Sequence, residues 1–323
     1  MKAFFLLLFA VASSFSYAQS APHISGEIQI SKITYRGWPN IYRVSNGRVE
    51  TIIVPAIGRV MEFRYVGGED IFWENAALAG QTADPNSKEW ANFGGDKSWP
   101  SPQADWPKMI GRNWPPPTGF DAVAYQAQVE NRAVELISPV DAGIRVRRKV
   151  QLDPAAPRME IVTSYEKVSG NPMKVGIGVI TQVRDPQRLF MVLPKKSRFP
   201  KGYVLQQFSP PQDVQVRDGL VSLKRGAKTS TQIGSDADTL LWMNDKYVLR
   251  IDSPRVRDAE YADQGTNTTI FTSADPQAYV ELETFGPLTV MKVGDHIERK
   301  NTYTLMERTE KDPEKEARKI AHQ

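Results

Sequence analysis

Two segments of the sequence hold residue types that could bind a sugar or act on one. The first, residues 92–103, reads Asn-Phe-Gly-Gly-Asp-Lys-Ser-Trp-Pro-Ser-Pro-Gln, and Trp106 and Trp114 follow it. An indole can stack on the C–H face of a pyranose, while amide, carboxylate and ammonium groups hydrogen bond with the sugar hydroxyls. We therefore expect Trp99 and Trp114 to be stacking platforms. The alternative is that the tryptophans form a small core that holds this segment down.

The second segment, residues 279–285, places two glutamates two positions apart. On a strand, Glu281 and Glu283 would share one face with Tyr279. Two close carboxylates raise the pKa of one of them, which suits general acid–base chemistry. A solvated outer face of a sheet would show the same pattern, so this alternative stays open.

Asp96 and Lys97 are the candidate partners of these glutamates, which makes all four residues the candidate catalytic group. Because Asp96 and Lys97 are neighbours, they could instead pair with each other or cap a turn. Gly94-Gly95 directly before them predicts a positive φ or a close approach of two backbones.

The elements that must position these residues are predicted to be strands. Apolar and polar residues alternate with a period of two, most clearly where Ile144, Val146, Val150 and Leu152 share one face. Similar runs occupy residues 27–36, 48–54, 59–66, 123–129, 158–168, 174–183, 244–251, 267–272, 278–284 and 300–306. Many strands and few helical patterns predict an all-β fold, a large antiparallel β-sandwich.

One long segment, residues 73–121, departs from this alternation. It holds five of the seven tryptophans and many prolines, including the run Pro115-Pro116-Pro117. Prolines restrict the backbone and so reduce the entropy lost on ordering, while the aromatic content argues against disorder. We expect a rigid loop, without regular secondary structure, that folds over one face of the sandwich.

Composition excludes several classes of protein and site. Of 323 residues, 41% are hydrophobic and 24% are charged, as in a globular protein with a large core. The sequence has no cysteine and only three scattered histidines, so we expect no disulfide, no thiol nucleophile and no metal cluster. The net charge of +4 is small and the basic residues are spread out, which argues against nucleic acid as a partner.

The N-terminus has the pattern of an export signal. Lys2 precedes an apolar run over residues 3–12, and small residues at 16 and 18 fit cleavage after Ala18. Residues 1–18 are therefore an expected signal peptide, which predicts a periplasmic or secreted protein without membrane insertion. Nucleotide cofactors are scarce outside the cytoplasm, and we expect no cofactor.

No linker-like change of composition divides the rest of the chain. We expect one domain over residues 24–308. The highly charged residues 309–323 are expected to be a tail, as a short exposed helix or a frayed end.

Taken together, these motifs resemble the galactose mutarotase-like (aldose 1-epimerase-like) superfamily. Residues 54–63 and 70–75 are similar to its opening strands, and residues 279–283 with Val293-Gly294-Asp295 are similar to its closing carboxylate strand. The segment around Gly94-Gly95-Asp96-Lys97-Ser98-Trp99-Pro100 looks like the hallmark of an uncharacterised secreted bacterial branch. The resemblance implies a β-supersandwich with a sugar site on its concave face. Candidate sugar-binding residues are Arg59, Asn75, Asn92, Trp99, Gln103, Trp106, Trp114 and Tyr279.

One departure from the superfamily concerns the catalytic acid. Catalytic mutarotases use a mid-chain histidine as the acid and a C-terminal glutamate as the base, but this sequence has no histidine between His23 and His296. Glu281 or Glu283 could supply the base. The acid would have to come from another residue: Lys97, Asp96, Arg59 or Tyr279.

Three functions fit the sequence. The first is a periplasmic protein that binds a mono- or oligosaccharide, with altered or weak sugar-converting activity. The second is a carbohydrate-active enzyme, an aldose epimerase or a glycan lyase or hydrolase, that uses Glu281 or Glu283 with Asp96 or Lys97. The third is a structural or assembly protein of the envelope whose aromatic segment docks a protein partner.

Overall fold

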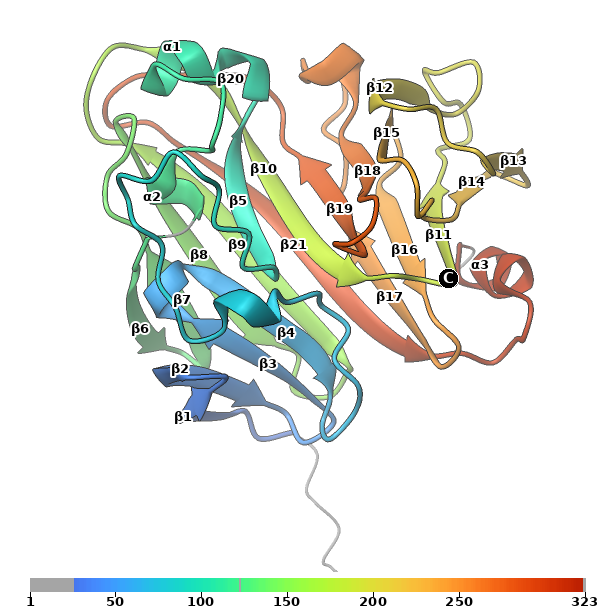
Figure 1. Cartoon of the computed structure of the whole chain (residues 1–323), viewed down its shortest axis with the longest axis horizontal. Coiled ribbons are helices and arrows are strands. Elements are labelled where there is room, and N and C mark those ends of the chain that lie inside the picture. The colour runs from blue at the N-terminus through green and yellow to red at the C-terminus, as the bar shows by residue number, and fades with distance from the viewer. Residues whose placement is uncertain (1–25, 122, 322–323) are drawn as a thin grey trace, which may run out of the picture.

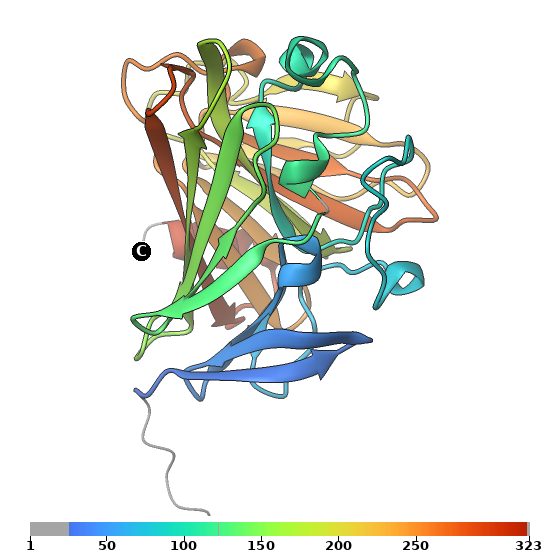
Figure 2. The same ribbon diagram turned by 90° about the vertical axis from the view of Figure 1, so that its left-hand side faces the viewer.

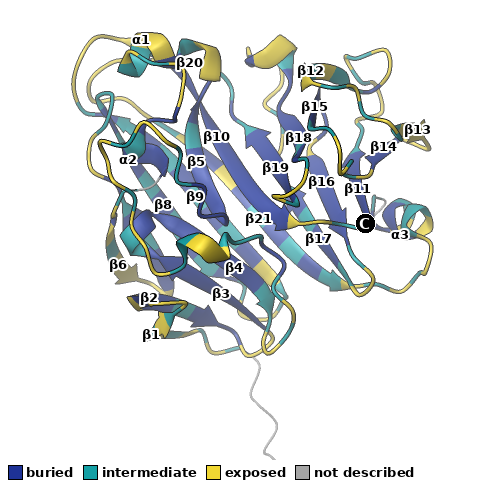
Figure 3. Ribbon diagram, in the orientation of Figure 1, coloured by how far each residue is buried: buried dark blue, intermediate teal, exposed yellow. Residues whose placement is uncertain are grey.

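The computed structural model describes residues 26–121 and 123–321, and the expected signal peptide lies outside this part of the chain. In the described part, antiparallel strands form two large sheets that pack face to face, so the all-β prediction is confirmed (Figures 1 and 2). Buried residues occupy the middle of both sheets, while exposed residues gather in turns and short helices (Figure 3).

The larger sheet carries the segments that the sequence singled out. Its strands are, in spatial order, β1 (Gln29–Tyr35), β2 (Trp38–Ser45), β3 (Val49–Val54), β4 (Arg59–Tyr65), β5 (Asp96–Ser101), β10 (Met173–Arg184), β19 (Tyr279–Phe285), β18 (Thr268–Thr272), β15 (Thr231–Ser235) and β12 (Val204–Phe208). The short strand β20 (Thr289–Met291) pairs with the first residues of β10.

The smaller sheet forms the other layer of the sandwich. Its strands are, in spatial order, β13 (Gln215–Arg217), β14 (Leu220–Leu223), β11 (Arg188–Val192), β16 (Thr239–Met243), β17 (Tyr247–Asp252), β21 (His296–Glu307), β9 (Arg158–Lys167), β8 (Ile144–Leu152), β7 (Ala133–Ile137) and β6 (Gln126–Glu130).

Helical segments are short. The α-helices are α1 (Trp106–Ile110), α2 (Thr118–Asp121) and α3 (Pro313–Ala321), and the 3₁₀ turns are η1 (Pro55–Ile57), η2 (Ala76–Leu78), η3 (Gln103–Asp105) and η4 (Asp263–Gly265). None of the helices within residues 26–321 that the structure describes is long and apolar enough to cross a bilayer.

The core between the sheets follows from strict alternation along the strands. In β8, Ile144, Val146, Val150 and Leu152 all point inward, as the sequence predicts. Alternation also turns Arg148 inward, where its side chain is fully buried. A charged group in the core needs a partner, because an unpaired buried charge is strongly destabilising.

Asp96 of β5 supplies that partner. The Arg148 guanidinium donates hydrogen bonds to the Asp96 carboxylate and to its backbone oxygen, and Thr181 Oγ1 and Tyr303 Oη donate to Asp96 Oδ2, each at 2.6 Å. Both members of the ion pair are fully buried. The pair therefore ties β5 of the larger sheet to β8 of the smaller one.

The expected structureless loop over residues 73–121 is wrong in its most important part, because Asp96–Ser101 is a strand inside the larger sheet. β5 pairs with β10 along its whole length, from Asp96 opposite Thr181 to Ser101 opposite Gly176. It pairs with β4 only where Val60 lies opposite Asp96. Beyond that point β5 behaves as an edge strand, where proline is tolerated, and this explains how Pro100 fits.

The first half of the segment does cover one face of the sandwich, as expected. Residues 73–94 lie against β2, β3 and β4, and Phe93 joins Trp38, Ile52 and Met61 in a second small core there. Within this segment, the Asn75 side chain caps the N-terminus of η2 by accepting the Ala77 N–H.

The charged C-terminal segment is not a freely exposed tail. α3 lies beside β11, and its residues Ala317 and Ile320 are buried among Phe190, Leu241 and Val248 (Figure 1). Because these apolar residues lie three positions apart, they share one face of the helix, and the charged residues occupy the rest.

Gly94 and Gly95 allow two backbones to meet just before β5. Both have a positive φ, and a Cβ atom at Gly94 would lie 2.1 Å from the Trp73 carbonyl oxygen. We predict that Gly94→Ala lowers the free energy of unfolding by about 2–4 kcal/mol, because it combines steric overlap with a disfavoured φ. Urea denaturation measures this change.

Gly47→Ala is the matched control. Gly47 also has a positive φ, but no atom lies within 4 Å of a Cβ built there. Its variant should lose only the backbone contribution of about 1 kcal/mol. Equal destabilisation of the two variants would contradict the role of close backbone approach.

Candidate functional site

The candidate site is a cavity of about 830 Å³ on the outer face of the larger sheet. Both aromatic rings and polar side chains line it. The aromatic residues are Trp90, Trp99, Trp106, Trp114, Phe208, Phe271, Tyr279 and Phe285. The carboxylates are Asp263, Glu281 and Glu283, and the side-chain amides are Gln103, Asn113, Gln206, Gln207, Gln232 and Gln264.

Alternation along two strands places the key groups on this face. In β19, Val280 and Leu282 enter the core, so Tyr279, Glu281 and Glu283 point outward, as the sequence predicts. In β5, Asp96 enters the core, which sends its neighbour Lys97 to the outer face. Asp96 therefore lies on the opposite face of the sheet from the glutamates, and its side chain is occupied by core contacts.

Four tryptophans form one wall of the cavity. Trp99 contacts Trp90, Trp106 and Trp114 edge to face, with ring centroids 5.7–6.0 Å apart. Trp114 also stacks on Trp106 at 6.1 Å. Trp106 is buried and donates its indole N–H to the Pro100 carbonyl, whereas 44% of Trp114 is exposed. The cluster thus unites the two roles that the sequence left as alternatives, with Trp106 as its buried core and Trp114 as its open face.

Asp121 orients this wall, and nothing in the sequence pointed to it. Its carboxylate accepts the indole N–H groups of Trp99 and Trp90 at 2.7 and 2.9 Å. It also pairs with Arg59, whose Nη2 lies 2.8 Å from Asp121 Oδ1. Arg59, fully buried, donates further to the Gly94 carbonyl. Arg59 thus supports the cavity wall from behind and does not line the cavity.

Lys97 and Glu281 form a buried ion pair at the base of the cavity. Lys97 Nζ lies 3.4 Å from Glu281 Oε1, and 4.9 Å from the centroid of the Trp99 ring. Burial lowers the pKa of Lys97 to about 8, against the opposing effect of the Glu281 charge. Burial likewise raises the pKa of Glu281, while Lys97 acts to lower it. A lysine of this pKa can hold or release a proton near neutral pH.

Among the described residues, no lysine, arginine or histidine forms an ion pair with Glu283. Its Oε1 accepts a hydrogen bond from Gln232 Nε2 at 3.3 Å, and 6% of the residue is exposed. Burial raises its pKa well above the usual value, and the negative charges of Glu281 and Asp263 raise it further. The two glutamates of β19 therefore have different environments, one paired and one unpaired.

Of three further residues expected at the site, Tyr279 lines the cavity, whereas Asn75 and Asn92 do not. Tyr279 lines the cavity and packs against Trp73, with ring centroids 4.7 Å apart. Asn92 is buried, and neither atom of its side-chain amide has a hydrogen-bond partner among the residues that the structure describes. Asn75 caps η2 outside the cavity lining. His296 is exposed at the start of β21, in the other sheet.

The structure brings together most of the expected residues from opposite ends of the chain. Those that line the cavity are Trp99, Gln103, Trp106, Trp114, Tyr279, Glu281 and Glu283. Sequence reasoning missed the far wall, which β12, β15, β18 and η4 supply: Gln206, Gln207, Phe208, Gln232, Asp263, Gln264 and Phe271. A cluster of glutamines near 206 and 232 was the available signal, but no motif linked it to the tryptophans.

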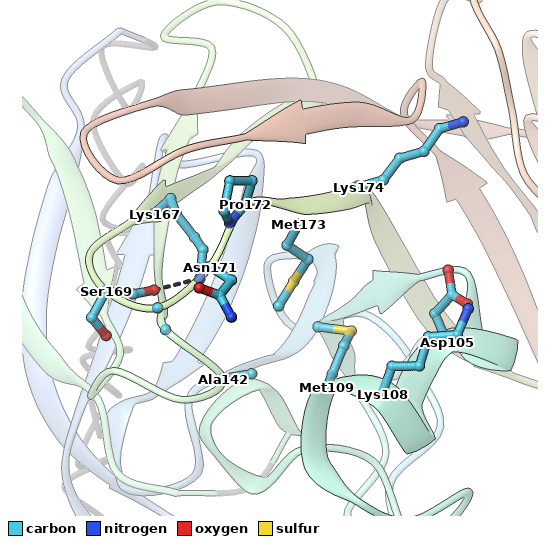
Figure 4. Close-up of a pocket in the computed structure, with 12 residues that line it drawn as sticks. Asp105, Lys108, Met109, Ala142, Lys167, Ser169, Asn171, Pro172, Met173 and Lys174 are labelled. Carbon is cyan, nitrogen blue, oxygen red and sulfur yellow. Dashed lines mark hydrogen bonds and ion pairs between the residues drawn. The ribbon is translucent and has the colours of Figure 1, made fainter.

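A second cavity, of about 470 Å³, has a different character (Figure 4). Met109 of α1 and Met173 of β10 lie toward each other across it, and Lys167 donates a hydrogen bond to the Ser169 carbonyl. Three lysines and one aspartate line it, and it lacks aromatic rings among the described residues. It therefore has no stacking platform for a sugar.

The ion pair at the base of the cavity makes a testable prediction about pH. Because the Glu281 charge stabilises the Lys97 ammonium, Glu281→Gln should lower the pKa of Lys97 further below 8, by about 1–3 pH units. Nuclear magnetic resonance of protein with ¹³C-labelled lysine measures this midpoint. Glu298→Gln, at an exposed position on β21, should leave it unchanged. A midpoint that stays near 8 in Glu281→Gln would contradict the coupling.

The fold can be compared with known proteins. No protein-family model matches the sequence, and no curated protein does. Among solved structures, a galactose mutarotase-like protein from Lactobacillus casei ATCC 334 superposes with a TM-score of 0.53 at 9% identity, over 82% of this chain and 100% of that one.

Two further structures agree with this. A candidate aldose 1-epimerase from Escherichia coli K12 gives a TM-score of 0.53 at 10% identity, over 87% of this chain and 100% of that one. A candidate mutarotase from Salmonella typhimurium gives 0.55 at 12% identity, over 86% and 94%. The chain therefore has the galactose mutarotase-like β-sandwich fold.

Proposed function

We propose that the protein binds a mono- or oligosaccharide in the cavity on the outer face of the larger sheet. The observation that supports this most is the pairing of a tryptophan wall with carboxylates and side-chain amides across one hollow. Indoles supply stacking surfaces for the C–H faces of a sugar ring, and the amides and carboxylates accept and donate hydrogen bonds in fixed directions.

The shape of the site supports a small ligand over a protein partner. A volume of about 830 Å³ lies within the range of small-molecule sites, which are concave and largely preformed. Trp114 contributes its exposed face to this hollow and not to a flat patch. A docking surface for a protein would be broader and flatter, so the envelope assembly function is less well supported.

The place of action is part of the same proposal. The apolar run before Ser16-Tyr17-Ala18 supports export, and we propose that the mature protein meets its sugar in the periplasm or outside the cell. The aldose 1-epimerase and mutarotase descriptions of proteins with the same fold favour a sugar as the ligand.

A second candidate function, sugar conversion, is favoured by the Lys97–Glu281 pair. Lys97 can exchange a proton near neutral pH, and Glu283 is a buried carboxyl with a raised pKa in the same site. One group could donate a proton to a ring oxygen while the other accepts one from a hydroxyl, which is the requirement for opening an aldose ring. Lys97 would then act as the acid.

Trp114→Ala tests the binding proposal. Loss of its exposed stacking face should weaken binding of the recognised glycan about tenfold or more. Because 44% of Trp114 is already exposed, the melting temperature should change little. A glycan array followed by isothermal titration calorimetry on the best ligand measures the change.

The control for this variant is Val290→Ala, which removes an exposed apolar side chain from β20, away from the cavity. It should bind as the wild type does. Trp99→Ala is a less selective test, because it also removes the indole N–H that Asp121 accepts and should lower stability. Wild-type affinity in Trp114→Ala would reject the platform assignment.

Glu283→Gln tests the enzymatic candidate. If the wild type accelerates interconversion of aldose anomers, this variant should lose about 10²–10⁴ in rate, because an amide cannot exchange the proton. One-dimensional proton exchange spectroscopy of the anomers measures the rate. Glu298→Gln, on the exposed face of β21, should keep the wild-type rate. Full activity in Glu283→Gln would eliminate the proposed acid–base role.

A further inference from the structure

The charges around the sugar cavity narrow the class of its ligand. Among the described residues that line the cavity, Asp263, Glu281 and Glu283 are acidic and none is lysine or arginine; Lys97 lies beneath this lining, paired with Glu281. The whole chain carries a net charge of +4, so the negative character of the cavity does not reflect overall composition. An acidic sugar, such as a uronate or a phosphorylated or sulfated sugar, would meet repulsion there.

The negative charge is only partly compensated. Glu281 has Lys97 as its counter-ion at 3.4 Å. Over the described ranges, neither Glu283 nor Asp263 has a lysine, arginine or histidine within 4 Å. Glu283 has only the long hydrogen bond from Gln232, although more than nine-tenths of it is buried. A buried carboxyl without a cation keeps its proton, because its charged form is costly there, and a cationic ligand would stabilise that charged form.

A second, independent observation also points to a ligand in this cavity. Ser101 lines it from β5, and its hydroxyl is buried without any hydrogen-bond partner in the described residues, with 3% of the residue exposed. Ser101 lies on the same strand face as Lys97 and Trp99 because of the period of two. Buried hydroxyls are rarely left unpaired, so this one fits a hydrogen-bonding group of a ligand.

Aromatic rings also line the cavity around the two glutamates of β19. Phe285 follows Glu283 on the same face of β19, and Phe271 of β18 lies opposite Glu281 in the sheet register. Tyr279 lies 6.0 Å from the Phe271 ring, between centroids. Faces of such rings attract cations as well as C–H groups, so they favour an ammonium group attached to a sugar ring.

We propose that the cavity binds a saccharide that carries a free amine, a hexosamine unit whose ammonium group is held by Glu283 with Asp263 at the rim. The sugar ring stacks against the tryptophan wall, and Ser101 hydrogen bonds with a ring substituent. This inference rests on the proposed function, since it names the class of sugar for that site.

Proton exchange on binding follows from the groups around Glu283. Glu281 and Asp263 raise its pKa, Lys97 lowers it, and its neutral neighbours across the sheet are Ile180, Thr269 and Gln232. An ammonium ligand adds a positive charge, which lowers the pKa of Glu283 and releases its proton. Binding therefore weakens as the pH falls, because protons compete with the ammonium group.

The test is calorimetric titration of the mature protein with trisaccharides of β-1,4-linked glucosamine, N-acetylglucosamine and glucose. We expect glucosamine to bind about tenfold more tightly than the two neutral sugars, the gain of one charged hydrogen bond. Titration in two buffers of different ionisation enthalpy should show proton release for glucosamine alone. Glu283→Gln should remove the glucosamine preference and the proton release, whereas Glu298→Gln should change neither.

The outcomes separate this inference from the function on which it rests. Equal affinity for glucosamine and glucose, or a glucosamine preference that survives in Glu283→Gln, overturns the amine assignment but leaves sugar binding intact. Binding of none of the three saccharides overturns both proposals. Spermidine, an amine without a sugar ring, is titrated as a fourth ligand. If spermidine binds as tightly as the glucosamine trisaccharide, the cavity attracts any amine, and the inference is overturned.

Discussion

The ion pair between Asp96 and Arg148 is the constraint on which the rest of the structure depends. It joins the two sheets inside the core, where both charges are fully buried and where Thr181 and Tyr303 complete the hydrogen bonds of the carboxylate. A buried pair of this kind contributes little net stability. Removal of either partner would nevertheless destabilise the fold strongly, because the remaining charge would be buried and unpaired. The ion pair therefore fixes which face of β5 points inward, and so which side chains reach the outer face.

Everything at the site follows from that choice of face. With Asp96 inward, Lys97, Trp99 and Ser101 point outward beside Glu281 and Glu283 of β19, two strands away. A shift of one residue in β5 would exchange these side chains with core residues, because the period of a strand is two. Behind the wall, Asp121 adds a second buried charge that orients Trp90 and Trp99. The cavity thus rests on two buried carboxylates that do not line it.

The sequence predicted the parts of this arrangement that depend on local pattern. Alternation in residues 144–152 and 279–285 indicated the inward and outward faces correctly, and Gly94-Gly95 indicated a close backbone approach that the structure contains. The expectation of a loop over residues 73–121 failed because Pro100 and Pro102 resemble breakers. Pro100 is tolerated because β5 pairs on one side only beyond Asp96, and Pro102 lies just after the strand. Pairing partners cannot be read from the local sequence.

The sequence alone determined the strand periodicity, the all-β class and the residue types that could form a sugar site, since these depend on neighbours along the chain. Only the tertiary structure decided that Lys97 meets Glu281, 184 positions away, and that glutamines of β12 and β15 face the tryptophans. It also decided that no cation within the described part of the chain pairs with Glu283. These contacts depend on strand order and on burial, and long-range packing sets both. The charge environment of a residue is determined by the groups that surround it in space.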